Sequence, residues 1–211
     1  MPVAGRRLVD WSLDAFRACE SVRSIVVAAP PGHVGELGGH DLGVVPGGAT
    51  RAESVANALE AVGTEYVAIH DAARPLLTPE LVAALVADLD AAPEAAGVIA
   101  AAPVTDTVKR ADRDLSAELS TPEVSNSALR VLTTEDRSQL WAAQTPQLFR
   151  TAALRDALAT AERPQEATDE AMLVEWNGGS VLIHPVAEPN LKVTTPLDLR
   201  VAELLLAERR G

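Results

Sequence analysis

The chain has 211 residues, a formal net charge of -12 at neutral pH and a single cysteine, Cys19. An acidic chain has no excess of Lys and Arg to displace counterions from nucleic-acid phosphates, which excludes general nucleic-acid binding but leaves room for a local phosphate pocket. One cysteine excludes an internal disulfide, and no apolar run reaches the roughly 18 to 20 residues needed to cross a bilayer. These features predict one cytoplasmic domain over residues 1–211.

The first half of the chain alternates between short apolar runs and segments with helical spacing. In chain order, the pattern predicts a helix over 8–19, strands over 24–29 and 43–45, a helix over 54–61, a strand over 66–70, a helix over 79–89 and a strand over 97–102. Thr78 before Pro79 is typical of a helix start. Because strands separated by helices imply right-handed crossovers, we expect an α/β fold with a Rossmann-like, mostly parallel sheet flanked by helices.

The second half departs from this alternation. Residues 105–134 have the pattern of two antiparallel strands joined by the polar stretch 111–127, and we expect them to form a projecting β-arm. Beyond the arm, the pattern predicts helices over 151–161 and 169–176, a strand over 180–185 and a final helix over 196–209.

Polar residues and glycines follow two of the predicted strands. Gly47 and Gly48 come after the strand over 43–45, and Asp71 and Arg74 come after the strand over 66–70. Open α/β sheets bind ligands outside the carboxyl ends of their strands. We therefore expect the two loops to border one small-molecule pocket.

Each candidate side chain has a functional and a structural interpretation. Arg74 is either a phosphate clamp with paired donors or one partner of a surface salt bridge. Asp71 either holds a divalent cation against substrate phosphates or caps a turn. Ser54 either offers its hydroxyl to a base or ribose or is a plain helix N-cap, and Arg51 anchors the glycine loop. The spacing of Asp71 from Arg74 favours the functional interpretation of that pair.

Three more polar side chains lie near predicted loop ends, namely Arg137, Thr168 and Lys192. None is diagnostic alone, since a lone Arg or Lys is usually a solvated surface group. His70 and His184 end apolar runs and are interpreted as ordinary, partly buried histidines. The sequence shows no convincing metal-ligand spacing of histidines and acids and no nucleophilic triad.

Six motifs in a fixed order cover nearly the full chain. They are Gly47-Gly48-x-x-Arg51-x-x-Ser54-Val55, His70-Asp71-Ala72-Ala73-Arg74-Pro75, Ala102-Pro103-Val104-x-Asp106-Thr107-Val108-Lys109, Gln144-Thr145-Pro146-Gln147-x-Phe149, Thr168-Asp169-Glu170 and Asn190-x-Lys192-Val193-Thr194-x-Pro196-x-Asp198-Leu199. Together they resemble the 2-C-methyl-D-erythritol 4-phosphate cytidylyltransferase family of isoprenoid biosynthesis. The combination is far more specific than any single motif.

The resemblance implies transfer of CMP from CTP to 2-C-methyl-D-erythritol 4-phosphate, with release of pyrophosphate and with Mg²⁺ bound. Carried over by position, it implies nucleotide binding by Gly47, Gly48, Ser54, Asp71 and Ala72, substrate binding by Arg74, Thr107, Thr168 and Lys192, catalysis by Arg137 and Lys192, and metal binding by Asp71. It also implies a homodimer through the arm, in which Arg137 serves the active site of the partner.

One departure from the family concerns the N-terminus, where the family has a strand and a loop of the form Leu-Ala-Ala-Gly-x-Gly-x-Arg that this sequence lacks. In the family, the loop wraps the triphosphate and the strand lies centrally in the sheet. We expect its absence to leave two unpaired strand edges and an open core, and we expect Met1 to be a miscalled downstream start.

Two other functions remain open from the sequence. The first is a related cytidylyltransferase that acts on ribitol 5-phosphate, against which Thr168 and Lys192 argue. The second is a noncatalytic dimer that binds a nucleotide or phosphate without turning it over, which the missing loop favours.

Overall fold

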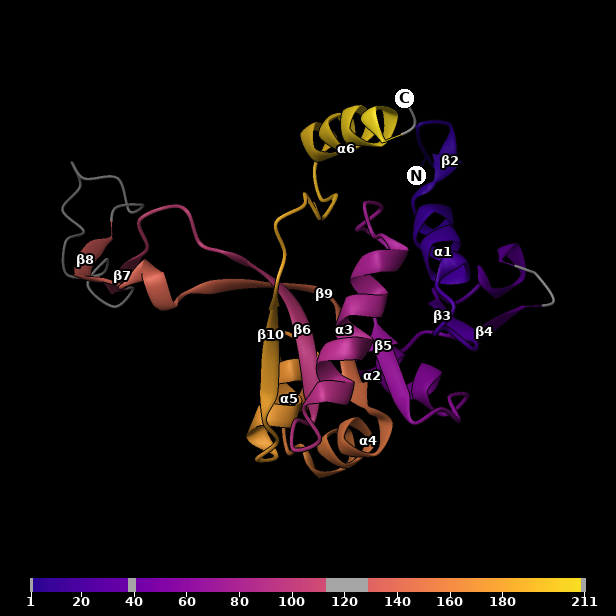
Figure 1. The fold of residues 1–211 in the computed structure, drawn as a ribbon, viewed down its shortest axis with the longest axis horizontal. Helices are drawn as coiled ribbons and strands as arrows, with labels where there is room; N and C mark the ends of the chain where they lie inside the picture. Colours follow the sequence, from indigo (N-terminus) through magenta and orange to yellow (C-terminus); the bar gives the residue numbers. More distant parts are fainter. Residues whose placement is uncertain (1, 38–40, 113–128, 210–211) are drawn as a thin grey trace, which may run out of the picture. The chain divides into compact units, whose positions relative to one another are not determined.

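The computed structural model describes residues 2–37, 41–112 and 129–209. The chain divides into two compact units, the first made of residues 1–100 and 144–211 and the second of residues 101–143. Figure 1 labels the elements along the chain.

The first unit contains most of the regular structure. Its helices are α1 (Leu8–Ala18), α2 (Arg51–Leu59), α3 (Pro79–Ala91), α4 (Thr151–Thr160), α5 (Glu170–Trp176) and α6 (Pro196–Glu208), with short 3-10 turns at Val34–Glu36 and Pro164–Glu166. Its strands are β1 (Pro2–Val3), β2 (Arg6–Arg7), β3 (Ile25–Ala29), β4 (Leu42–Pro46), β5 (Tyr66–Ile69) and β10 (Val181–Pro185). Two further strands, β6 (Gly97–Pro103) and β9 (Trp141–Arg150), begin or end in the second unit. The α/β class predicted from the sequence is confirmed.

The helix starts follow from side-chain caps. Thr78 accepts a hydrogen bond from the backbone N–H of Leu81, with Pro79 in the first turn, as predicted. Helix α2 begins at Arg51 rather than at residue 54, because Thr50 and Glu53 form a reciprocal capping box. The first turn of α2 is polar, so the apolar spacing did not reveal it.

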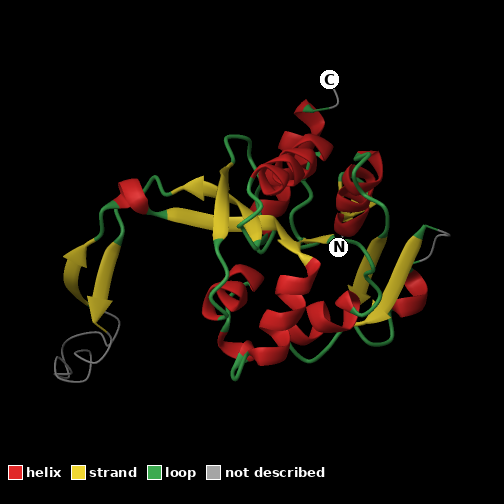
Figure 2. Ribbon diagram, turned by 60° about the horizontal axis from the view of Figure 1, so that its bottom comes forward, coloured by secondary structure: helices red, strands yellow, loops and turns green. Residues whose placement is uncertain are grey.

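The strands form a mixed arrangement. One sheet has the order β10-β6-β9-β5, and a separate parallel pair joins β3 to β4 (Figures 1 and 2). Strand β9 runs antiparallel to β5, with Tyr66 opposite Arg150 and Ile69 opposite Gln147. The sequence analysis missed β9, because Pro146 and its polar neighbours interrupt the apolar pattern.

Helices cover both faces of the larger sheet. Leu148 packs with Leu85 and Leu89 of α3, whereas its neighbour Phe149 packs with Val55 of α2 and Leu154 of α4. Successive side chains of a strand point to opposite faces, so β9 serves two core clusters at once. A side chain on Gly97 would lie 2.3 Å from the ring of Phe149, which explains why the strand carries glycine there.

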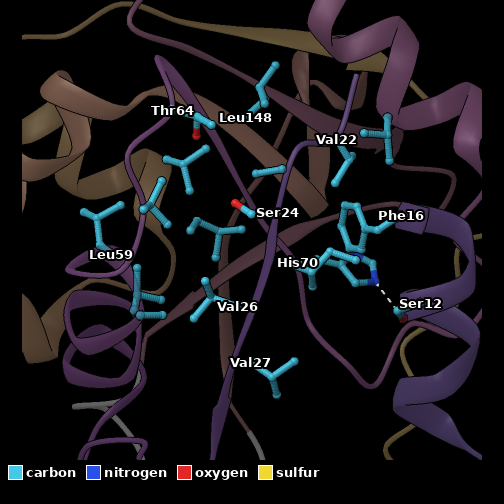
Figure 3. Close-up of a pocket in the computed structure, with 18 of the residues that line it drawn as sticks. Ser12, Phe16, Val22, Ser24, Val26, Val27, Leu59, Thr64, His70 and Leu148 are labelled. Carbon is cyan, nitrogen blue, oxygen red and sulfur yellow. Dashed lines mark hydrogen bonds between the residues drawn. The ribbon is translucent and has the colours of Figure 1, made fainter. Parts of the chain in front are cut away.

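An apolar cavity of about 730 Å³ lies between β3 and β5. Within the described residues, β3 is hydrogen-bonded to β4 alone and β5 to β9 alone, so each has an unpaired edge. Figure 3 shows side chains of this cavity, among them Val26 and Val27 of β3. The expectation of two unpaired strand edges and an open core is confirmed.

The second unit is a two-stranded antiparallel ribbon of β7 (Lys109–Asp112) and β8 (Arg130–Thr134), followed by a 3-10 turn at Arg137–Gln139 (Figure 2). The predicted antiparallel strands are confirmed. Residues 113–127 of the predicted connecting stretch lie outside the described residues.

Candidate functional site

The loop after β4 is held by its own hydrogen bonds. The backbone N–H of Gly47 donates to the carbonyl of Ala29 at 2.7 Å, and that of Gly48 donates to Ser54 Oγ at 3.0 Å. A Cβ on Gly48 would lie 2.2 Å from the Cβ of Glu53, so this position excludes any side chain. The N–H groups of Ala49 and Thr50 donate to the carboxylate of Glu53. This loop is therefore not a cradle of free N–H groups for phosphate.

Ser54 lies inside α2, one turn after the cap. Its hydroxyl accepts from the N–H of Gly48 and donates to the carbonyl of Thr50 at 2.9 Å. Thr50 is the N-cap, so the interpretation of Ser54 as a plain N-cap is wrong. A hydroxyl has two lone pairs, and one of them remains for a ligand donor.

Asp71, two residues after the end of β5, is the centre of a charge cluster. Its carboxylate lies 2.8 Å from Lys192 Nζ, 3.5 Å from Arg51 Nε and 4.0 Å from Arg74 Nε. Burial alone raises the pKa of Asp71, but the hydrogen bond from Lys192 and the three positive charges outweigh it and lower that pKa below its ordinary value. Asp71 is therefore ionised at neutral pH.

Arg74 is the last residue of the turn that begins at Asp71, and its side chain is held by a neighbouring segment. Its side chain is 12% exposed, and one terminal nitrogen donates to the carbonyl of Asn190 at 2.6 Å. Its Nε is buried and has no hydrogen-bond partner. Burial lowers the pKa of Arg74 despite the attraction of Asp71. A simple surface salt bridge does not describe this residue.

The segment around Lys192 runs along the Asp71–Arg74 turn. The N–H of Val193 donates to the carbonyl of Ala73 at 2.8 Å, and the side-chain amide of Asn190 donates to the carbonyl of Thr145 at 2.9 Å. Lys192 itself is 46% exposed, so its ammonium contacts both Asp71 and solvent. The structure thus brings Lys192 together with Asp71 and Arg74, three residues to which the family resemblance assigns site roles.

Sequence reasoning gave Arg51 and Glu170 no site role. Arg51 forms an ion pair with Glu170, which is 1% exposed, and its Nε faces Asp71. Burial raises the pKa of Glu170 more than the charge of Arg51 lowers it. Both residues belong to quoted motifs, but only the fold shows that Arg51 links the glycine loop to Asp71. Arg51 therefore does more than anchor the loop.

The other predicted site residues are Thr168, Ala72, Thr107 and Arg137. Thr168 is exposed, two residues before Glu170, and its hydroxyl contacts Met172 Sδ at 3.7 Å. Ala72 follows Asp71 in the same turn. Thr107 and Arg137 belong to the second unit, where Arg137 donates to the carbonyl of Thr105 at 2.5 Å.

The described residues hold no group of three or more His, Cys, Asp or Glu side chains that would bind a metal by themselves. Mg²⁺ often takes one or two protein carboxylates and fills its other positions with water and phosphate oxygens. The ionised carboxylate of Asp71 fits that role as a single protein ligand. In the same part of the chain, no helix has the length and apolarity to span a membrane.

The comparisons with known proteins agree with one another. The family model described as 2-C-methyl-D-erythritol 4-phosphate cytidylyltransferase matches residues 1–208. The chain is 40% identical to the protein of that name from Paraburkholderia phymatum, covering 97% of this chain and 86% of that protein, and 38% identical to the one from Synechococcus sp., covering 99% and 90%. A crystal structure of the Thermus thermophilus protein of that name superimposes with a TM-score of 0.78 at 35% identity, covering 98% of this chain and 91% of that one.

Proposed function

Because the chain belongs to the 2-C-methyl-D-erythritol 4-phosphate cytidylyltransferase family, we propose that it transfers CMP from CTP to 2-C-methyl-D-erythritol 4-phosphate in isoprenoid precursor synthesis. An oxygen of the polyol's phosphate group attacks the α-phosphorus of CTP. The bond from that phosphorus to the oxygen that bridges it to the β-phosphorus breaks, and pyrophosphate leaves with the bonding electrons. The observation that carries the proposal is the cluster of Arg51, Arg74 and Lys192 around Asp71.

This cluster suits a reaction between two anions. Arg51, Arg74 and Lys192 surround the carboxylate of Asp71, and the ammonium of Lys192 is also exposed to solvent, where a phosphate group can reach it. Phosphoryl-type transfers depend chiefly on positioning and on neutralisation of charge. We assign Lys192 and Arg74 to the phosphate of the polyol, and we assign Thr168 to the same substrate.

The nucleotide side of the site is the glycine loop. Its N–H groups are occupied, so Gly47 and Gly48 shape the loop rather than bind phosphate. The spare lone pair of Ser54 Oγ is available to an amino group such as that of cytosine. We assign the base to this loop and the triphosphate to the turn that contains Asp71 and Ala72.

Mg²⁺ is part of the proposal, with Asp71 as its protein ligand; when bound, it supplies positive charge to the phosphates of CTP. The carboxylate of Asp71 also orients Lys192, whose Nζ it accepts from at 2.8 Å. Both roles need the ionised form, which the lowered pKa of Asp71 favours.

We further propose a cytoplasmic homodimer joined through residues 105–134, in which Arg137 acts in the site of the partner. Thr107 is assigned to the binding of the methylerythritol substrate. The exposed apolar side chains of Leu129, Val131 and Leu132 support this, since such side chains gain from burial. The buried free thiol of Cys19 is consistent with a reducing compartment.

The test is CTP-dependent pyrophosphate release with 2-C-methyl-D-erythritol 4-phosphate and, separately, with ribitol 5-phosphate. It is run on this chain and on the chain extended upstream to the next in-frame start. Turnover of 2-C-methyl-D-erythritol 4-phosphate is expected. A higher rate with ribitol 5-phosphate would contradict the proposed substrate. Phosphate binding without turnover in either protein would favour the noncatalytic dimer.

A further inference from the structure

His70 contacts both ends of the turn that carries Asp71 and Arg74. Its Nδ1 lies 3.2 Å from Thr145 Oγ1, and its Nε2 lies 3.2 Å from the carbonyl of Arg74 and 3.2 Å from Ser12 Oγ. Its ring meets Phe16 edge to face at 5.5 Å, and Figure 3 shows Phe16 beside His70 with the contact to Ser12. The imidazole is therefore held on several sides.

The hydrogen bonds assign the proton of this ring. The carbonyl of Arg74 can only accept, so Nε2 donates to it at 3.2 Å; the hydroxyl of Thr145, which accepts from the backbone N–H of Asp71 at 3.0 Å, then donates to His70 Nδ1. Nδ1 is then the acceptor of the ring and Nε2 carries the hydrogen. That N–H donates to the carbonyl of Arg74, whose backbone N–H closes the turn onto the carbonyl of Asp71 at 2.9 Å.

We infer that His70 is a positioning residue for the proposed reaction: as the Nε2–H tautomer, it fixes the turn from Asp71 to Arg74 through Thr145 at one end and the Arg74 carbonyl at the other. The inference rests on the proposed function for its effect on substrate, but not for its geometry. Without the imidazole, the Thr145 hydroxyl loses its acceptor, and among the described residues the Arg74 carbonyl keeps only Ser12 as a donor, at 3.4 Å.

The geometry is tested without substrate. In His70→Phe, hydrogen exchange of the Asp71 amide is expected to speed up at least about tenfold, because its acceptor Thr145 is released. The matched control is His184→Phe, which changes a second partly buried histidine, paired with Asp88. Nitrogen NMR of the wild-type ring is expected to show Nδ1 unprotonated. Unchanged exchange in His70→Phe, or a proton on Nδ1, would overturn the inference.

The effect on the site is tested by calorimetric binding of 2-C-methyl-D-erythritol 4-phosphate. His70→Phe and Thr145→Val are each expected to weaken binding about tenfold, and the double variant no more than either alone, since both remove one linkage. Thr145→Ser, which keeps the hydroxyl, is expected to restore most of the affinity. Additive losses, or unchanged affinity in His70→Phe, would overturn the positioning role. No binding by the wild type would instead count against the proposed function, and the amide exchange would still decide the geometry.

Discussion

At the scale of single residues, the candidate site is a small cluster of cations around one carboxylate, that of Asp71. Asp71 contacts three cations, and each of them also contacts another part of the chain or solvent. Removal of one cation is therefore expected to change both the charge around Asp71 and the orientation of the other cations.

Lys192→Gln is expected to lower kcat/KM at least about 100-fold, which is about 2.7 kcal/mol of lost transition-state stabilisation. The physical reason is the loss of the ammonium that lies on Asp71 and is exposed to substrate. Steady-state pyrophosphate release measures it. Arg163→Ala, which removes an exposed pair with Glu166, is the control and is expected to leave the rate unchanged. Equal rates for Lys192→Gln and the control would contradict the assignment of Lys192.

His70 predicts a pH dependence of stability. Burial lowers its pKa from 6.5 to about 4, with Asp71 and Arg74 as its charged neighbours acting in opposite directions. Between these two pH values the unfolded chain binds a proton that the native chain does not, so stability falls as the pH falls from 6.5 to about 4, by about 3 kcal/mol in total. Urea unfolding at several pH values measures this loss. His70→Phe is expected to reduce it, and an equal pH dependence in that variant would show that other groups cause it.

At the scale of elements, the sequence predicted those that follow a simple period and missed those that tertiary contacts define. The helix after Thr78 has a cap, a proline and an apolar face, all readable in order. Strand β9 has polar residues at its centre. Thr145 accepts a hydrogen bond from the backbone N–H of Asp71, and Gln147 accepts one from the backbone N–H of Ala171 in α5. Local patterns do not encode such long-range partners. For the same reason, Arg51 and Glu170 were found only when the fold brought them together.

Gly48→Ala tests the loop that connects β4 to α2. Its Cβ would meet Glu53 at 2.2 Å, so the loop must move and the capping box weakens. We expect a loss of about 1 to 3 kcal/mol of unfolding free energy. Thermal and urea unfolding give the value. The matched control is Gly63→Ala, where the added Cβ meets nothing within 4 Å, and it is expected to be neutral or slightly stabilising. Similar stabilities for the two variants would refute the contact.

At the scale of the whole molecule, the order of the six motifs was enough to identify the family. The cavity between β3 and β5 could be located only in the structure. The apolar walls of that cavity, about 730 Å³ in volume, are not covered by any described strand. The resemblance predicted two unpaired edges, but not which helices would line the gap. Residues of α1, α2 and α3 do so, including Phe16, Leu59 and Val82.

The cavity is expected to bind the dye anilinonaphthalene sulfonate in the native state, since exposed apolar surface enhances its fluorescence. Val26→Lys places a charge on the wall shown in Figure 3 and is expected to remove at least about half of the signal. Leu204→Lys, at an exposed position of α6, is the control. If both variants reduce the signal equally, the dye does not report on the cavity.

The strand order β10-β6-β9-β5 has a consequence for biosynthesis on the ribosome. Strand β5 must wait for β9, more than seventy residues later in the chain, before it gains the partner that places Thr145 beside Asp71. Lys192 is made later still, so the charge cluster around Asp71 is not complete until residue 192 has been synthesised. Contacts of such long sequence separation form slowly, and we expect the cluster around Asp71 to form after the local helices of the first unit.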